Sequence, residues 1–325
     1  MSSIIFVDLL IVTAKTSAQN LVPNPSFEAY KELQCDLNRP IFPPYENPKV
    51  WFQSILEDWV LPTETPSQIF SLLLDDSCAT NPLLFNKGLP KDGFNMVSII
   101  LTQHYTLIPN ANARSYIQVK LMEKLKKNQY YMAGGYQSYS NMVSFHAANN
   151  LGMLFTEEAI GNDNSDMLKF RPQINENEVN MERLVWKTFG GCFQAKGNEQ
   201  FLTIGGFYDD SETTVVQVIE GDLRGTAIAH YFIDSVYVEQ VNDLWIPNVI
   251  TPNGDGLNDS FVIRGLEKGQ WSLMVYNKWG KTVYHNTDYR NNWSGEKLHS
   301  GVYFYLLKHR VCSTLQYKGT LTIIH

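Results

Sequence analysis

The sequence is poor in charged side chains, and basic residues are the scarcer kind. Charged residues make up 18% of the 325 residues, with 26 Lys and Arg against 33 Asp and Glu. A protein that binds nucleic acid through its phosphates needs a basic face, so this composition argues against a nucleic-acid partner. Hydrophobic residues reach 44%, which supplies a core and excludes disorder over most of the chain.

Motifs of the common enzyme classes are missing as well. The chain contains no GxSxG, HExxH or GxGxxG sequence, and its seven His are scattered. Adjacent carboxylates occur at 75–76, 157–158 and 209–210, but neighbours in a strand point to opposite faces and do not form an acid/base pair. We therefore predict a non-enzymatic protein without an organic cofactor. A glycosidase assembled from two distant carboxylates is the alternative.

The cysteines have no spacing typical of a zinc site. There are four of them: Cys35, Cys78, Cys192 and Cys312. Cys35 and Cys78 both lie in Pro- and Asn-rich sequence near the start of the chain, so a disulfide between them is expected in an oxidising compartment. The alternative is four free thiols.

No apolar run near the start is long enough to span a bilayer. Residues 4–12 form a short apolar run, and Ala18 follows as a small residue suited to cleavage. This pattern predicts a signal peptide over residues 1–18. Asp8 interrupts the run and no Lys or Arg precedes it, so a buried strand at the start of a domain is the alternative.

Most of the chain shows the short alternation of apolar and polar residues that is typical of half-buried strands. Clusters of Gly, Asn, Asp and Pro separate the alternating segments. The best helical candidate is residues 122–128, which allow one or two turns at most. In the first 241 residues, strands are expected at 115–121, 130–139, 150–155, 184–193, 200–207 and 230–239.

A second unit begins after residue 241, where the charge balance also changes. Residues 1–242 carry 17 basic and 27 acidic side chains, whereas residues 243–325 carry 9 basic and 6 acidic ones. Such an asymmetry indicates two modules with different partners. The second module has the size of an Ig-like β-sandwich. Its strands are expected at 261–264, 271–276, 282–285, 301–308 and 316–324.

The second module carries one continuous motif. Residues 246–261 read IPNVITPNGDGLNDSF, followed by VYNKWGKTVY at 275–284 and SGVYFY at 300–305. This sequence resembles the gliding-motility-associated C-terminal domain, the type B sorting domain of the type IX secretion system. The resemblance implies an interaction with that outer-membrane machinery, followed by display on the cell surface or release. The residues that carry it include Pro252, Asn253, Gly254, Asp255, Gly256, Asn258, Asp259, Asn277, Trp279, Gly280, Trp293, Gly295, Gly301 and Tyr303.

The first loop of this motif combines glycines with side-chain oxygens. Gly254 and Gly256 are suited to turns with positive φ, and Asn and Asp cap such turns. A turn held by side-chain hydrogen bonds is one interpretation. The other is a Ca²⁺ site, although the loop is shorter than an EF-hand loop and lacks its distal Glu. The oxygen ligands would come from Asn253, Asp255, Asn258 and Asp259.

Two segments at the ends of the first unit carry a second resemblance. Residues 20–28 read NLVPNPSFE and residues 231–238 read YFIDSVYV. They resemble the first and last strands of galactose-binding-like jelly rolls, the fold of many carbohydrate-binding modules. In that family a Ca²⁺ often ties these strands together, and the matching positions are Glu28 and Asp234, whose carboxylates suit a hard cation. The alternative is that Glu28 caps a turn and Asp234 faces solvent.

These patterns predict an all-β protein, with a jelly-roll β-sandwich over residues 20–241 and a small Ig-like sandwich over residues 243–325. We expect the first unit to act in recognition or adhesion at the cell surface, with a glycan or a surface protein as ligand. A structural role in a surface or gliding-motility assembly is the alternative, and an enzyme acting on polysaccharides ranks last. Aromatic residues available to a sugar site, most of them expected in the core, are Trp51, Trp59, Tyr105, Tyr136, Tyr139 and Tyr208.

Overall fold

The computed structural model describes residues 19–33, 47–74, 88–105, 108–140, 144, 146–218, 226–267 and 269–325. The expected signal peptide at 1–18 and the cysteines Cys35 and Cys78 lie outside these residues, so the structure says nothing about either prediction. Within the described residues the fold consists of strands and one helix, α1 (Pro48–Ile55). The predicted all-β class is confirmed. No helix of the described residues is long and apolar enough to cross a membrane.

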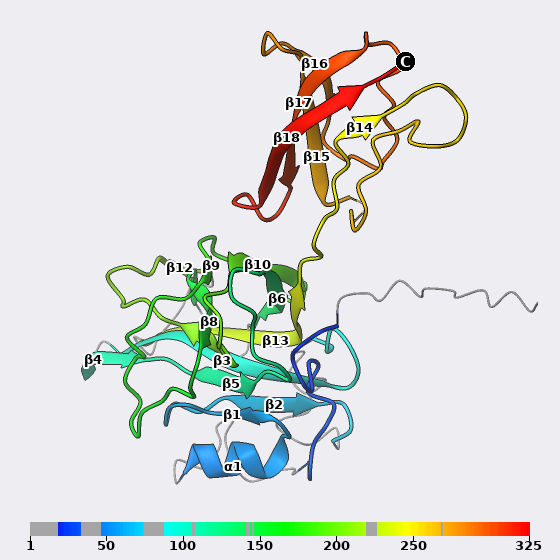
Figure 1. Cartoon of the computed structure of the whole chain (residues 1–325). Helices are drawn as coiled ribbons and strands as arrows, with labels where there is room; N and C mark the ends of the chain where they lie inside the picture. Colours follow the sequence, from blue (N-terminus) through cyan, green and yellow to red (C-terminus); the bar gives the residue numbers. More distant parts are fainter. Residues whose placement is uncertain are drawn as a thin grey trace, which may run out of the picture.

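The first unit consists of two sheets that enclose one core (Figure 1). Apolar side chains of both sheets meet in this core, among them Val119 and Leu202 from one sheet and Ile99 and Ile233 from the other. The smaller sheet has the order β1 (Trp59–Val60), β5 (Tyr116–Lys120), β11 (Phe201–Gly206), β8 (Leu151–Thr156) and β9 (Ile174–Glu176).

The larger sheet contains the longest strands of the protein. Its main path runs through β10 (Lys187–Gln194), β6 (Tyr130–Tyr139), β13 (Thr226–Gln240), β3 (Asn95–Tyr105) and β2 (Gln68–Ser71). Three short strands extend it: β4 (Ile108–Ala113) pairs with β3, and β7 (His146–Ala148) pairs with both β13 and β12 (Val215–Gln217). The finer jelly-roll assignment stays a prediction.

The predicted helix at 122–128 is wrong. Its backbone bonds to another segment instead of to itself, because the N–H of Leu125 donates to the carbonyl of Glu199 at 2.8 Å. The side chain of Leu125 is buried, and Asn128 has a φ of 65°, which a helix does not allow. The observed helix α1 instead begins with Pro48 and buries Phe52 and Ile55 against the first unit.

Two expected strands are irregular. Residues 20–28 form bends and turns, although they do lie beside the last strand of the first unit: the N–H of Leu21 donates to the carbonyl of Val238 at 2.8 Å. Residues 261–264 contain only an isolated bridge between Arg264 and Trp245. In both segments, scattered hydrogen bonds replace a continuous strand ladder: the N–H of Phe261 donates to the carbonyl of Trp293, whereas the N–H of Ile263 donates to Asn291 Oδ1.

The second unit has one five-stranded sheet, β14 (Val249–Ile250), β18 (Gln316–Ile323), β17 (Gly301–His309), β15 (Trp271–Tyr276) and β16 (Thr282–Asn286). Leu273, Val275 and Leu307 face a core that Phe261 and Tyr289 complete from outside the sheet. This unit follows β13 in the chain and lies beyond the end of the first unit (Figure 1). The core of the second unit also contacts Tyr130, Met132 and Cys192 of the first unit.

Candidate functional site

Glu28 and Asp234 meet at loop 91–95, which leads into β3. Asp234 Oδ2 accepts hydrogen bonds from the N–H groups of Lys91 at 2.7 Å and Asp92 at 3.0 Å. Glu28 Oε1 accepts from the N–H groups of the next residues in this loop, Phe94 and Asn95, at 2.8 Å each. The structure therefore brings the two carboxylates to one loop.

Asp234 is fully buried, contrary to the alternative in which it faces solvent. Burial raises its pKa from 3.8 to about 7, while the N–H groups of Asp92, Ser235 and Lys91 act in the opposite direction. The nearby carboxylate of Asp92 adds a smaller increase in the pKa. Asp234 is a buried acid held by backbone donors, an environment that a bound cation would change strongly.

Other atoms near this loop suit a hard cation only in part. Asn95 Oδ1 is buried without a hydrogen-bond partner among the described residues, and amide oxygens are ligands that Ca²⁺ accepts. Gly93 has a φ of 64°, and a Cβ at this position would clash with the carboxyl group of Glu28, so the close approach of this loop to Glu28 requires a glycine. No group of three or more His, Cys, Asp or Glu in the described part of the chain is placed to hold a metal. An ion here would depend on carbonyl and water oxygens, and it stays a prediction.

The loop at 253–259 is held by its own side chains. Asp259 accepts the N–H groups of Gly254 at 2.8 Å and Gly256 at 2.7 Å, one with each carboxylate oxygen. Asp255 accepts the N–H of Leu257 at 2.7 Å, and hydrogen bonds from the side chain of Asn253 and from this N–H lower its pKa. These are the side-chain-capped turns that one interpretation of the sequence proposed. Ca²⁺ binding to Asn253, Asp255, Asn258 and Asp259 stays a prediction.

The remaining motif residues form turns and packing contacts. Asn277 Oδ1 accepts the N–H groups of Trp279 and Lys281 at 3.0 Å each, closing the hairpin between β15 and β16. The side chain of Trp279 is 81% exposed, whereas Trp293 stacks on Tyr284 with ring centroids 5.0 Å apart. Gly280, Gly295 and Gly301 have φ values of 77°, 68° and 156°, and the hydroxyl of Tyr303 donates to the carbonyl of His299.

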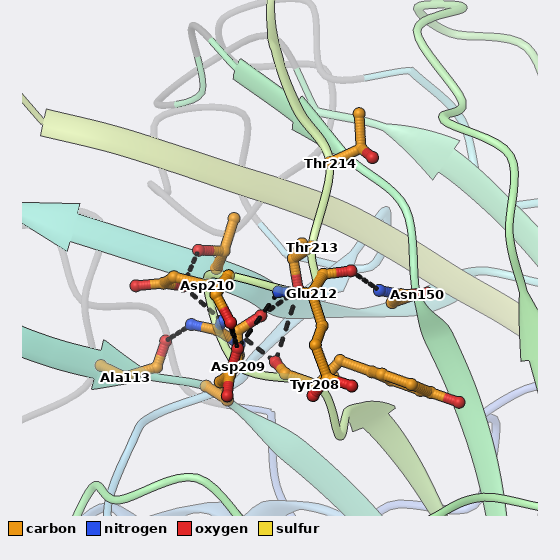
Figure 2. Close-up of polar contacts among 12 residues, drawn as sticks. Ala113, Asn150, Tyr208, Asp209, Asp210, Glu212, Thr213 and Thr214 are labelled. Carbon is orange, nitrogen blue, oxygen red and sulfur yellow. Dashed lines mark hydrogen bonds and ion pairs between the residues drawn. The ribbon is translucent and has the colours of Figure 1, made fainter.

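A polar cluster that the sequence did not predict lies at loop 208–214 (Figure 2). Arg114 is completely buried, and its guanidinium binds Asp210 Oδ1 at 2.5 Å. The same guanidinium donates to the carbonyls of Ala113 and Tyr208, each at 3.3 Å. Asp209 accepts the N–H of Ser211 at 2.9 Å and thereby closes a tight turn. A buried charge thus fixes this loop to the strand that begins at Tyr116.

The outer side of this loop presents an aromatic ring with charged neighbours. The guanidinium of Arg171 lies 4.4 Å from the ring centroid of Tyr208 and binds Glu212 Oε1 at 2.7 Å. Among the other aromatic candidates, Trp59 and Tyr139 are buried in the core. Trp51 and Tyr136 are partly exposed, and the side chain of Tyr105 lies outside the described residues.

A pocket of about 270 Å³ opens on the second unit. Its walls come from the start of this unit and from the 256–264 segment, with Trp245, Val249 and Val262 among the lining residues. The guanidinium of Arg264 lies 4.9 Å from the ring centroid of Trp245, which is 57% exposed. The pocket therefore combines an accessible indole with a cation inside the sorting-motif region.

Cys192 and Cys312 form a disulfide with a Cα–Cα distance of 5.2 Å, within the usual range for such a bond. The sequence did not indicate this pair. Cys192 lies in β10 of the first unit and Cys312 in the β17–β18 hairpin of the second, so no local spacing could have indicated the bond.

Comparison with known proteins identifies the second unit. Residues 244–323 match the family model of the CHU_C type IX secretion signal domain. The predicted sorting domain is thereby confirmed, and the chain is an exported protein that is secreted or displayed at the cell surface. Its sorting domain implies an interaction with the type IX secretion machinery.

Comparisons of the whole chain are less informative. A search of curated proteins gave no match. Among solved structures, the adhesin domain of Epf from Streptococcus pyogenes aligns with 9% identity over 83% of this chain and 81% of that chain. The TM-score of 0.25 is too low to support a conclusion about fold or function.

Proposed function

We propose that the chain is a non-catalytic surface protein whose second unit directs export and whose first unit recognises a ligand outside the cell. The match of residues 244–323 to a type IX secretion signal domain is the observation that carries the export part. The sorting step needs a folded shape rather than chemistry, and the self-capped 253–259 loop supplies a rigid feature of that shape.

Deleting residues 243–325 tests the export part. The truncated protein should stay in the periplasm, whereas the full chain should be accessible to antibody or protease on intact cells. A reporter fused to residues 243–325 is the matching gain-of-function arm and should reach the surface. Surface display of the truncated protein would overturn the proposal.

We place the ligand-binding surface of the first unit at loop 208–214. Flat aromatic rings beside a few hydrogen-bonding groups are typical of sugar sites. Tyr208 begins the loop that Arg114 holds in place, and the guanidinium of Arg171 lies over its ring. Because the buried ion pair fixes the loop before any ligand arrives, binding would need little ordering of the backbone.

A glycan array with the exported protein tests this assignment. Binding should be lost or at least tenfold weaker in Tyr208→Ala, and it should persist in Tyr30→Ala, which removes an exposed tyrosine elsewhere on the first unit. A signal that Tyr208→Ala leaves unchanged would exclude this face. Absence of any glycan signal, together with self-association in solution, would favour the structural role in a surface assembly.

A further inference from the structure

Three neighbouring strands of the first unit present a row of residues to the second unit. Cys192 of β10 lies opposite Met132 of β6, and Met132 lies opposite Glu239 of β13. Residues directly opposite each other in antiparallel strands share one face of the sheet. Adjacent strands are about 4.8 Å apart, so the backbone of Cys192 lies roughly 10 Å from that of Glu239.

This row contains two connections between the units. One is the chain itself, which leaves β13 after Gln240 and enters the second unit through residues 241–245. The other is the disulfide from Cys192 to Cys312. A single flexible connection would allow the second unit to rotate about it, whereas two connections at separate points remove most of that freedom.

The surroundings of the disulfide are built from both units. Cys312 is only 2% exposed, and its N–H donates to His309 Nδ1 at 3.0 Å. Tyr130 and Met132 of the first unit pack against the core that contains Cys312. Both sulfur atoms therefore reach bonding distance only when each unit has folded and the two have docked.

We propose that Cys192–Cys312 is an interdomain clasp that makes the recognition unit and the sorting unit one covalent body, so that a cut in the chain at 241–245 does not separate them. Closing the bond removes one proton and one electron from each thiol. A second disulfide, on a small molecule or on a protein, takes up the two electrons and two protons and becomes a dithiol. Because the protein is exported, it reaches compartments where such a bond persists.

The clasp is independent of which ligand the first unit binds. Its consequence is that the sorting unit stays attached to an intact recognition unit on the cell surface even if a protease cleaves between them. Reduction would be the step that frees the recognition unit after such a cut.

The test places a recognition site for a sequence-specific protease between Asn242 and Asp243 of the full chain purified under oxidising conditions. After cleavage, the protein should migrate as one band on a denaturing gel without reductant and as two fragments with dithiothreitol. Cys192→Ser should separate into two fragments even without reductant. The double variant Cys35→Ser/Cys78→Ser is the matched control and should behave like the parent.

Separation of the cut parent without reductant would overturn the proposal. Disulfide mapping of the uncut chain without the inserted site provides a second measurement, because the insertion itself could disturb the interface. A peptide linking Cys192 to Cys312 is expected, and recovery of both as free, alkylatable thiols would also overturn the proposal.

Discussion

Glu28 and Asp234 hold opposite halves of the same loop through backbone N–H groups. Asp234 binds the first half of loop 91–95, and Glu28 binds the second half. Glu28 follows the irregular N-terminal segment and Asp234 lies in β13, so this loop joins the beginning and the end of the first unit. The carboxylates therefore have a structural role whether or not an ion accompanies them.

Replacing Asp234 by Ala should destabilise the first unit by about 2–3 kcal/mol, because the backbone N–H groups of Lys91, Asp92 and Ser235 lose their buried acceptor. The loss is smaller than a sum of strong hydrogen bonds because the buried carboxyl itself is costly to desolvate. Urea unfolding at fixed pH measures the change. Asp163→Ala removes a fully exposed carboxylate and should leave the midpoint unchanged.

Chelation tests whether Ca²⁺ sits at this loop. If it does, EGTA should lower the melting temperature by several degrees, since a site filled at 100 times its Kd stabilises by about 2.7 kcal/mol. Adding Ca²⁺ in excess should reverse the shift. The effect should vanish in Asp234→Asn and persist in Asp255→Asn, which alters the other candidate site. An identical melting curve with and without EGTA would contradict the prediction.

The sequence predicted the half-buried strand β15 and also the largely buried strands β5, β8 and β11, but it missed β3. The expected bounds of β6 and β15 agree with the structure. The side chains of β15 alternate between the core and a more open face, whereas most of those of β6 are buried. In β3, Val97, Ile99 and Leu101 are buried, and so are the neighbouring Ser98 and Thr102. A strand covered on both sides carries no two-residue period.

Contacts between distant residues explain the other misses. The side chains that accept the N–H groups of loop 91–95 are more than 60 residues away in the chain, as the hydrogen bond from the N–H of Asn95 to Glu28 Oε1 illustrates. Four cysteines allow three pairings, and only the docking of the two units brings Cys192 to Cys312. The sorting domain was predictable because its continuous motif resembles a known family, and the turns in that motif were predictable because Gly, Asn and Asp favour them locally.

Loss of one partner of the Arg114–Asp210 ion pair should lower the stability of the first unit, because the guanidinium of Arg114 is completely buried. Asp210→Asn leaves the buried guanidinium of Arg114 without its carboxylate. Because the Asp210 side chain is itself 33% exposed, the expected loss of stability is about 2–3 kcal/mol, below the range for a fully buried pair. Glu212→Gln breaks the exposed pair with Arg171 and should change stability little, because solvent screens that pair. Urea unfolding compares the two variants. Equal small effects would show that the buried pair does not hold the loop.

Acid should destabilise the second unit through His309. Burial lowers the pKa of this side chain below its usual 6.5, and its Nδ1 accepts the N–H of Cys312, so the folded state favours the neutral ring. The unfolded chain therefore binds the proton more readily, and the free energy of unfolding should fall as pH drops below about 6.5 until the folded pKa is passed. Above pH 6.5 this contribution is constant.

Urea unfolding between pH 5 and 8 measures this effect by tryptophan fluorescence, to which Trp271, in contact with the ring of His309, contributes. The free energy of unfolding should depend less steeply on pH in His309→Gln than in the parent. His285→Gln changes an exposed histidine and should keep the parent slope. Because Asp234 titrates with the opposite sign in this range, only the difference between parent and variant isolates His309, and equal slopes would contradict the prediction.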